Sequence, residues 1–240
     1  MNDTASAEQR ADKSDQSRGV VRAVIREVMG VPFVAATLFI PAWRFNWAMG
    51  WALVGLYAIW VAATALILIP NNPDLLIERA TRKKGKTWDT VILSIVGLTT
   101  IAKYILAGLD VRLEWTAQMS LALQIAALVV AVLGYALGTW AMAANAFFSK
   151  VVRIQEDRGH AVATGGPYRY VRHPGYIGTI AFELATPIML GSLWALIPGG
   201  LAALLFVVRT ALEDKTLLEE LDGYTEYAQQ TRYRLLPGVW

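Results

Sequence analysis

Long runs of apolar residues constrain this chain more than any other feature of its sequence. The clearest run covers residues 47–69 and contains no charged side chain. A bilayer core requires about 20 such residues per helix, because no water is present there to satisfy backbone polar groups. Charged residues make up only 17% of the chain, below the roughly 25% that is usual for soluble domains. The sequence therefore predicts an all-α, polytopic integral membrane helix bundle.

Six apolar segments predict about six membrane spans, of which the last two form a C-terminal helical hairpin. The expected spans are residues 28–42, 47–69, 88–109, 117–144, 176–190 and 193–208. The first segment is short and contains Pro32 and Pro41, which predicts a tilted or broken helix. Gly191 and Ser192 predict the tight turn of the hairpin. We expect a single transmembrane domain over residues 20–240.

The basic residues indicate the orientation of the chain in the membrane. All but three of the 22 Lys and Arg residues fall on one side of the six-span arrangement, the exceptions being Arg44, Lys103 and Arg112. Because such residues accumulate in cytoplasmic loops, we expect both termini in the cytoplasm, in a bacterial inner membrane. Residues 1–19 are polar and lack the apolar core of a signal peptide, which predicts a disordered cytoplasmic tail.

The composition also limits the expected partners. Basic residues are not gathered in one patch with aromatic residues, so membrane lipids are expected partners and nucleic acid is not. The basic segment 75–86 either sets the topology alone or lies on the membrane surface against anionic lipid. The chain has no Cys and only two His, His160 and His173, which excludes thiolate chemistry and argues against a metal site. These features do not predict the oligomeric state.

One segment differs sharply from the apolar sequence around it. Residues 145–178 mix glycine, aromatic, basic and histidine residues, and residues 165–167 predict a turn. Arginine and tyrosine are common anchors at the membrane interface, which accounts for Arg169 and Tyr170. It accounts less well for the combined residues 172–176, Arg-His-Pro-Gly-Tyr. We therefore expect a functional site in this loop.

A second polar cluster begins where the last expected span ends. Arg209 and Glu213 are four residues apart, so on a helix they share one face and can form an ion pair. Polar side chains at such depth usually face a cavity or a partner, although an ordinary surface pair fits this spacing equally well. The tail ends in aromatic, basic and proline residues, and we expect it to fold back as a lid or a pocket wall.

These two clusters resemble the isoprenylcysteine carboxyl methyltransferase family. The resembling segments are GGPYRYVRHPGYIG at 165–178 and RTALEDKTLL at 209–218, and the likeness covers about residues 130–240. The chain is also similar to the wider group that contains membrane phospholipid N-methyltransferases. The resemblance implies a membrane-embedded methyltransferase that uses S-adenosylmethionine, with residues 130–240 as its catalytic half. The first four spans match only in hydrophobic character, so the methyl acceptor is weakly constrained.

The resemblance also implies which residues form the site, in a cofactor pocket made by this loop and the final helices. The matching cofactor-binding residues are His160, Gly166, Tyr168, His173, Pro174 and Tyr176. The family's Arg-x-x-x-Glu pair falls on Arg209 and Glu213, which implies a catalytic role on the substrate side. The family usually has two consecutive glutamates, whereas here Glu213 is followed by Asp214, which we assign to the cofactor site.

The expected chemistry needs alignment of methyl donor and acceptor and exclusion of water, but no covalent intermediate. No strand with Gly-x-Gly-x-x-Gly precedes a helix, so the pocket is expected to be helical. His173 or Arg172 could bind the cofactor carboxylate. Arg209 would hold a carboxylate acceptor, whereas a thiol or an amine would need Glu213 as a base. A lipid-like or small acceptor could enter from the bilayer, and the donor from the cytoplasm.

Two other functions fit the same sequence features. An NADPH-dependent membrane reductase of the sterol reductase type has a similar aromatic, basic and proline ending. A non-catalytic membrane assembly or transport factor would keep the fold without the chemistry.

Overall fold

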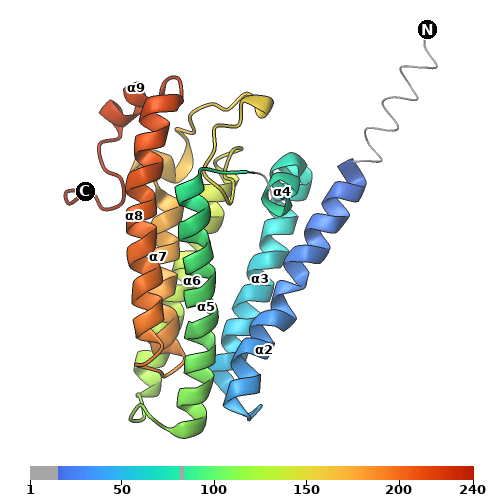
Figure 1. Ribbon diagram of the computed structural model, residues 1–240, viewed down its shortest axis with the longest axis vertical. Helices are drawn as coiled ribbons and strands as arrows, with labels where there is room; N and C mark the ends of the chain where they lie inside the picture. Colours follow the sequence, from blue (N-terminus) through green and yellow to red (C-terminus); the bar gives the residue numbers. More distant parts are fainter. Residues whose placement is uncertain (1–15, 82–83) are drawn as a thin grey trace.

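The long helices of this protein run side by side along one axis (Figure 1). The computed structural model describes residues 16–81 and 84–240, and within these ranges the chain forms helices and loops without a strand. The predicted fold class is therefore confirmed. Large apolar side chains face outward, and Ile59, Leu66 and Leu98 are 68%, 76% and 68% exposed. Such a surface suits lipid rather than water.

Five helices in the described residues are long and apolar enough to cross a membrane. They are Gln16–Ala42, α3 (Ala48–Asn71), α5 (Thr87–Leu113), α6 (Leu121–Ala143) and α8 (Leu196–Glu220). A further helix, α7 (Pro174–Met189), has 16 residues and is about 24 Å long, slightly shorter than a bilayer core. It packs against both α6 and α8. The predicted hairpin of α7 and α8 is therefore present, whereas the count of six spans stays a prediction.

The first helix is longer than its apolar segment. It begins at Gln16 instead of residue 28, so residues 16–19 of the predicted disordered tail are helical, and residues 1–15 lie outside the described residues. Its second part, α2 (Gly30–Ala42), starts just before Pro32, which cannot donate the backbone hydrogen bond that would continue the preceding turn. The helix extends toward the N-terminus because Ala23 is fully buried against neighbouring apolar side chains.

A short helix, α4 (Pro73–Ala80), follows α3 directly. The side chain of Asn72 caps it by accepting a hydrogen bond from the backbone N–H of Leu75 at 3.1 Å. Leu75 and Leu76 are buried and pack in one cluster with Leu68 of α3. The apolar face of this part of the basic segment therefore contacts the bundle instead of lipid.

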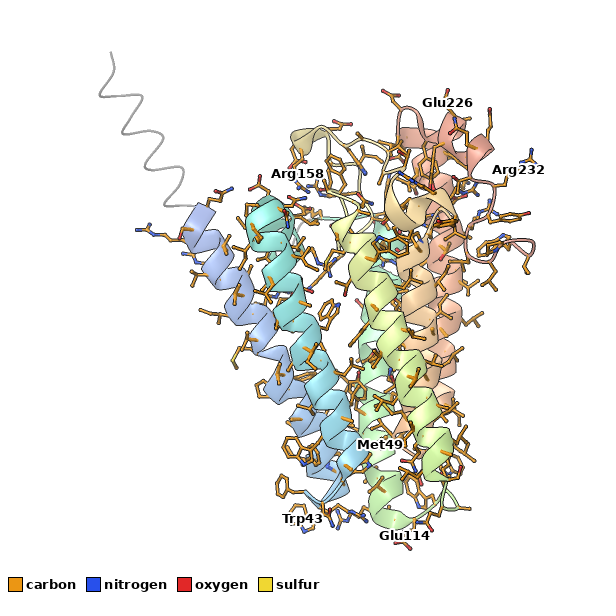
Figure 2. The ribbon with its side chains drawn as sticks, turned by 180° about the vertical axis from the view of Figure 1, so that it is seen from behind. Trp43, Met49, Glu114, Arg158, Glu226 and Arg232 are labelled. Atoms are coloured by element: carbon orange, nitrogen blue, oxygen red, sulfur yellow. The ribbon has the colours of Figure 1, made fainter. Side chains whose placement is uncertain are left out.

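The polar parts of the chain gather at one end of the bundle. Figure 2 shows Trp43 and Glu114 at one end, and Arg158, Glu226 and Arg232 at the opposite end. The second end, here called the loop end, contains α4, the loop 144–173 and α9 (Tyr224–Gln230) (Figure 1). The loop includes the short 3-10 helices η1 (Glu156–Arg158) and η2 (Gly166–Arg169). The two clusters predicted to carry chemistry thus lie at the same end.

Two glycines allow α6 and α7 to approach closely. A Cβ atom on Gly178 would lie 2.3 Å from the carbonyl oxygen of Gly134, and a Cβ atom on Gly134 would lie 2.6 Å from the carbonyl oxygen of Gly178. Small residues at a helix contact let two backbones meet, which is a common way to pack helices within a membrane. This contact fixes α7, and with it the start of the candidate site.

Candidate active site

The C-terminal tail folds back onto the loop, as the sequence predicts. The backbone N–H groups of Arg172 and His173 donate to the carbonyl oxygens of Tyr233 and Arg234, each at 2.9 Å. Tyr227 of α9 also donates its hydroxyl to the carbonyl of Tyr168 at 2.7 Å. These bonds bring together segments that are about 60 residues apart in the chain, and they enclose one side of a cavity.

This cavity, here called the loop-end cavity, has a volume of about 400 Å³. Most of the predicted site residues line it. They are His160, Tyr168, Arg172, His173, Tyr176, Arg209 and Glu213. The loop 144–173 and the C-terminal part of α8 therefore both line the loop-end cavity.

Gly166 and Pro174 shape the backbone beside the loop-end cavity and are not among its lining residues. Gly166 has φ +56°, and a Cβ atom there would lie 2.9 Å from the Cβ atom of Ala144. A larger residue would therefore be both strained and crowded. Pro174 is the first residue of α7, where its missing N–H leaves no helical hydrogen bond unmade.

Asp214 also lies behind the cavity wall. Its side chain has no exposed surface, and it accepts hydrogen bonds from Arg172 Nη2 at 2.9 Å, Arg234 Nε at 2.7 Å and the Tyr224 hydroxyl at 2.9 Å. Its Oδ1 atom is 3.1 Å from Nε2 of His173. The carboxylate therefore anchors Arg172 and His173 in the wall and is not itself a lining group.

Arg209 does not form the ion pair that its spacing from Glu213 allows. Its Nε donates to Oδ1 of Asp89 at 2.6 Å, and its Nη2 donates to the carbonyl of Lys150 at 2.8 Å. Asp89 comes from the first turn of α5 and also accepts the N–H of Val152 at 2.8 Å. Asp89 was missed by the sequence reasoning, although a carboxylate at the start of an otherwise apolar span was a visible signal.

Glu213 binds a tyrosine instead. The hydroxyl of Tyr176 donates to Oε2 of Glu213. The guanidinium carbon of Arg209 lies 5.3 Å from the centre of the Tyr176 ring, within range of a cation–π contact. Tyr176 thus connects the two predicted catalytic residues, and all three side chains face the loop-end cavity.

His160 lies in the loop 144–173 and lines the loop-end cavity. Its Nδ1 accepts the backbone N–H of Gln155 at 3.2 Å, and its ring centre lies 4.7 Å from that of Phe147. Burial, together with the nearby charges of Arg153 and Arg158, lowers the pKa of His160 to about 4. The imidazole is therefore neutral near pH 7.

Basic residues dominate the charge of the loop-end cavity. The charged residues in its lining are Arg79, Lys150, Arg153, Arg172, Arg209 and, as the one acid, Glu213. Arg79 of α4 is buried, and its Nη1 donates to the carbonyl of Phe148 at 3.0 Å. Nothing in the local sequence distinguished Arg79 from its neighbours in the basic segment. Four of these cations already pair with carboxylates, and they are Lys150, Arg153, Arg172 and Arg209. Arg79, which has no ion pair within the described residues, is therefore the cation of the lining that favours a negatively charged ligand.

A second cavity, here called the inner cavity, adjoins the first within the bundle. Its volume is about 390 Å³, and α2, α3, α5, α6 and α7 contribute most of its wall. Four residues line both cavities. They are Arg79, Phe148, Gly175 and Thr179. A ligand that reaches past this shared wall could therefore occupy both spaces.

The fold and the site together define an integral membrane protein with a charged cavity at one end of its helix bundle. Comparison with known proteins gives the narrower identification. Residues 126–219 match the sequence model of the isoprenylcysteine carboxyl methyltransferase (ICMT) family, which confirms the predicted family. Over this segment the chain is therefore similar to the membrane methyltransferases of the ICMT family.

Several relatives carry the same name. The chain is 25% identical over 182 residues to a probable protein-S-isoprenylcysteine O-methyltransferase of Oryza sativa subsp. indica. This alignment covers 71% of this chain and 92% of the relative. It is 40% identical to the enzyme of Schizosaccharomyces pombe over 45 residues, or 19% of each chain. A solved structure of the eukaryotic intramembrane Ras methyltransferase ICMT aligns with a TM-score of 0.48 at 20% identity, covering 90% of this chain and 86% of that one.

No candidate metal centre is present in the described ranges, where no three His, Cys, Asp or Glu side chains group closely enough to hold an ion.

Proposed function

We propose that this protein transfers a methyl group from S-adenosylmethionine to a carboxylate of a lipid-like acceptor. The observation that carries the proposal is the pair of adjoining cavities: a charged one at the loop end and a mainly apolar one inside the bundle. A polar donor and an apolar acceptor would each find a suitable space, with the shared wall between them. When bound, S-adenosylmethionine supplies an electrophilic methyl group on its sulfonium.

The lining of the loop-end cavity suits this donor. Its volume of about 400 Å³ falls within the range of small-ligand pockets, roughly 300 to 1,000 Å³. Tyr168 and Tyr176 offer aromatic surface, and Arg172 offers a fixed cation for a carboxylate because Asp214 holds it in place. Glu213 is the acid in the lining that could face a sulfonium. We therefore assign donor binding to these residues.

The charge of the site favours a carboxylate acceptor over an amine. Four of the five basic residues in the lining pair with carboxylates. The fifth, Arg79, has no ion pair within the described residues, and its charge favours a carboxylate over an ammonium group. The bonds of Arg209 to Asp89 and Lys150 use Nε and Nη2, so its Nη1 group can donate to an acceptor. Arg79 lies in the wall that both cavities share. We propose that these two cations hold the acceptor carboxylate. A carboxylate needs no general base, so Glu213 would orient Tyr176 and balance the donor's charge.

The proposal is tested by methyl transfer in detergent or nanodiscs. Purified protein is given labelled S-adenosylmethionine and either an S-prenylated N-acetylcysteine or its methyl ester, which lacks the free carboxylate. We expect base-labile label in the free acid alone. Arg79→Gln should raise the KM for the acid at least tenfold, because a buried charged hydrogen bond is lost, while the exposed Arg232→Gln should leave it unchanged.

Other outcomes would point to the competing functions. Equal labelling of the acid and the ester would contradict a carboxylate acceptor. Absence of labelling by folded protein that binds NADPH would support the reductase, and absence of both would support the non-catalytic membrane factor.

A further inference from the structure

A buried ion pair lies at the inner cavity, between α5 and α7. Lys103 of α5 and Glu183 of α7 are 2.6 Å apart, measured from Nζ to Oε2, and their side chains are 0% and 7% exposed. The Lys103 ammonium also lies 5.0 Å from the ring centre of Tyr104 and 5.4 Å from that of Phe182. Glu183 is one of the residues that line the inner cavity.

Such a pair is a costly way to join two helices. Well-packed apolar side chains of similar size are often at least as stabilising as a buried ion pair. Charged groups within membrane spans usually face a cavity or a pathway. Helix packing could account for Lys103, which has no exposed surface, but the side chain of Glu183 is 7% exposed and the residue lines the cavity.

Three tyrosines line the same cavity. They are Tyr57 of α3, Tyr104 of α5 and Tyr135 of α6. Their hydroxyl groups, like Oε1 of Glu183, make no hydrogen bond to residues 16–81 or 84–240. None of these four groups is among the fully buried atoms that lack a partner, so each has accessible surface at the cavity and is open to a hydrogen bond from a bound ligand.

The rest of the wall is suited to an apolar body. The rings of Trp60 and Tyr135 stack at 5.6 Å between centres, and those of Tyr135 and Phe182 at 4.2 Å. Glu183 follows Tyr176 by seven residues on α7, which places it about 10 Å further along the helix. The polar groups are therefore set at a definite depth behind the reacting end of the site.

We propose that the inner cavity binds the apolar body of the methyl acceptor, and that this body carries a neutral hydrogen-bonding group about 10 Å from the methylated atom. A hydroxyl, carbonyl or amide group would fit. A charged group would not, because Lys103 and Glu183 already balance each other and an extra charge would be costly in this setting. This inference rests on the proposed function and narrows its substrate class from any lipid-like carboxylate to an oxygenated or amide-bearing one.

The test compares two probes that differ in one group. Both are N-acetylcysteines with an S-alkyl chain of equal length, and one chain carries a hydroxyl group about 10 Å from the carboxylate. We expect the wild-type protein to show a KM about tenfold lower for the hydroxylated probe, since one hydrogen bond is gained, with kcat unchanged. The double variant Tyr104→Phe and Tyr135→Phe should lose this preference, so that its KM values for the two probes become equal. Tyr170→Phe, which changes an exposed tyrosine, is the matched control.

Probe-induced stabilisation separates failure of this inference from failure of the proposed function. The unfolding temperature of the detergent-solubilised protein is measured with each probe, independently of methyl transfer. Stabilisation by the hydroxylated probe that exceeds that by the plain one supports the inference even if neither probe is methylated. Equal stabilisation and equal KM would overturn it, although methylation of both would leave the proposed function intact. A preference that persists in the double variant would overturn the assignment to these tyrosines.

Discussion

Asp214 holds Arg172 and His173 in the wall of the loop-end cavity without lining that cavity itself. The family pattern usually has a second glutamate at this position, and the shorter aspartate side chain here is fully enclosed by its partners. The bonds to Arg172, Arg234 and Tyr224 explain why a shorter carboxylate suffices. Its role is to position the groups that we assign to donor binding.

Replacing Asp214 by asparagine should therefore impair both folding and donor binding. Two guanidinium groups would lose their buried counter-charge, which costs roughly 3 kcal/mol or more. We expect a lower unfolding temperature and an affinity for S-adenosylhomocysteine that falls at least tenfold, measured by calorimetry on protein that remains folded. The control is Asp222→Asn, at an exposed position. Unchanged affinity in Asp214→Asn would show that Arg172 and His173 do not depend on this anchor.

His160 gives a prediction for pH. Its pKa is lowered by burial and by Arg153 and Arg158 to about 4, against an ordinary value of 6.5. Between these two values the unfolded chain binds more protons than the folded one, so this residue makes stability fall as the pH drops from 6.5 to 4. Above pH 6.5 it makes no contribution to the pH dependence. Unfolding of the wild type and of His160→Gln, followed from pH 4 to 8, should differ in slope only below 6.5. Parallel curves would contradict the shift.

At the scale of the elements, α7 matters because it carries His173 and Pro174 at its start and Glu183 within the bundle. Its position is set by the contact of Gly178 with Gly134 of α6. The hydropathy of the chain was enough to predict α7, and its 16 residues show why its status as a full span could not be decided from length alone.

Gly178→Ala should separate α6 from α7. The added Cβ atom would lie 2.3 Å from a backbone oxygen, so the helices must shift, at a cost of roughly 1 to 3 kcal/mol. We expect a clear drop in the unfolding temperature of the detergent-solubilised protein and weaker acceptor binding. Gly97→Ala on α5 meets no atom within 4 Å and should be neutral or slightly stabilising. Equal unfolding temperatures for the two variants would show that the close contact is not required.

For the molecule as a whole, the sequence was sufficient to predict the helical membrane fold and most of the loop-end cavity. Long apolar runs predict helices directly, and the family motif marked His173, Tyr176, Arg209 and Glu213. The sequence could not predict side-chain contacts between residues that are far apart in the chain. Arg209 binds Asp89, which is 120 residues away, and this contact replaces the local ion pair with Glu213. The start of the first helix at Gln16 was also missed, because packing and not hydropathy extends it.

Two adjoining cavities divide the molecule into a charged end and an apolar interior. With this division, a water-soluble donor could bind in the loop-end cavity while the apolar part of a membrane-soluble acceptor stays in the inner cavity. This arrangement requires the loop-end cavity to be the site for S-adenosylmethionine, because Arg79 and Arg209, the proposed acceptor groups, both line that cavity.

Titration of the purified protein with S-adenosylhomocysteine tests that claim most directly, with NADPH as the comparison ligand. We expect saturable binding of one S-adenosylhomocysteine per chain at micromolar concentration, weakened by His173→Ala, and no binding of NADPH. Absence of binding to the folded wild-type protein, or binding of NADPH in its place, would contradict it.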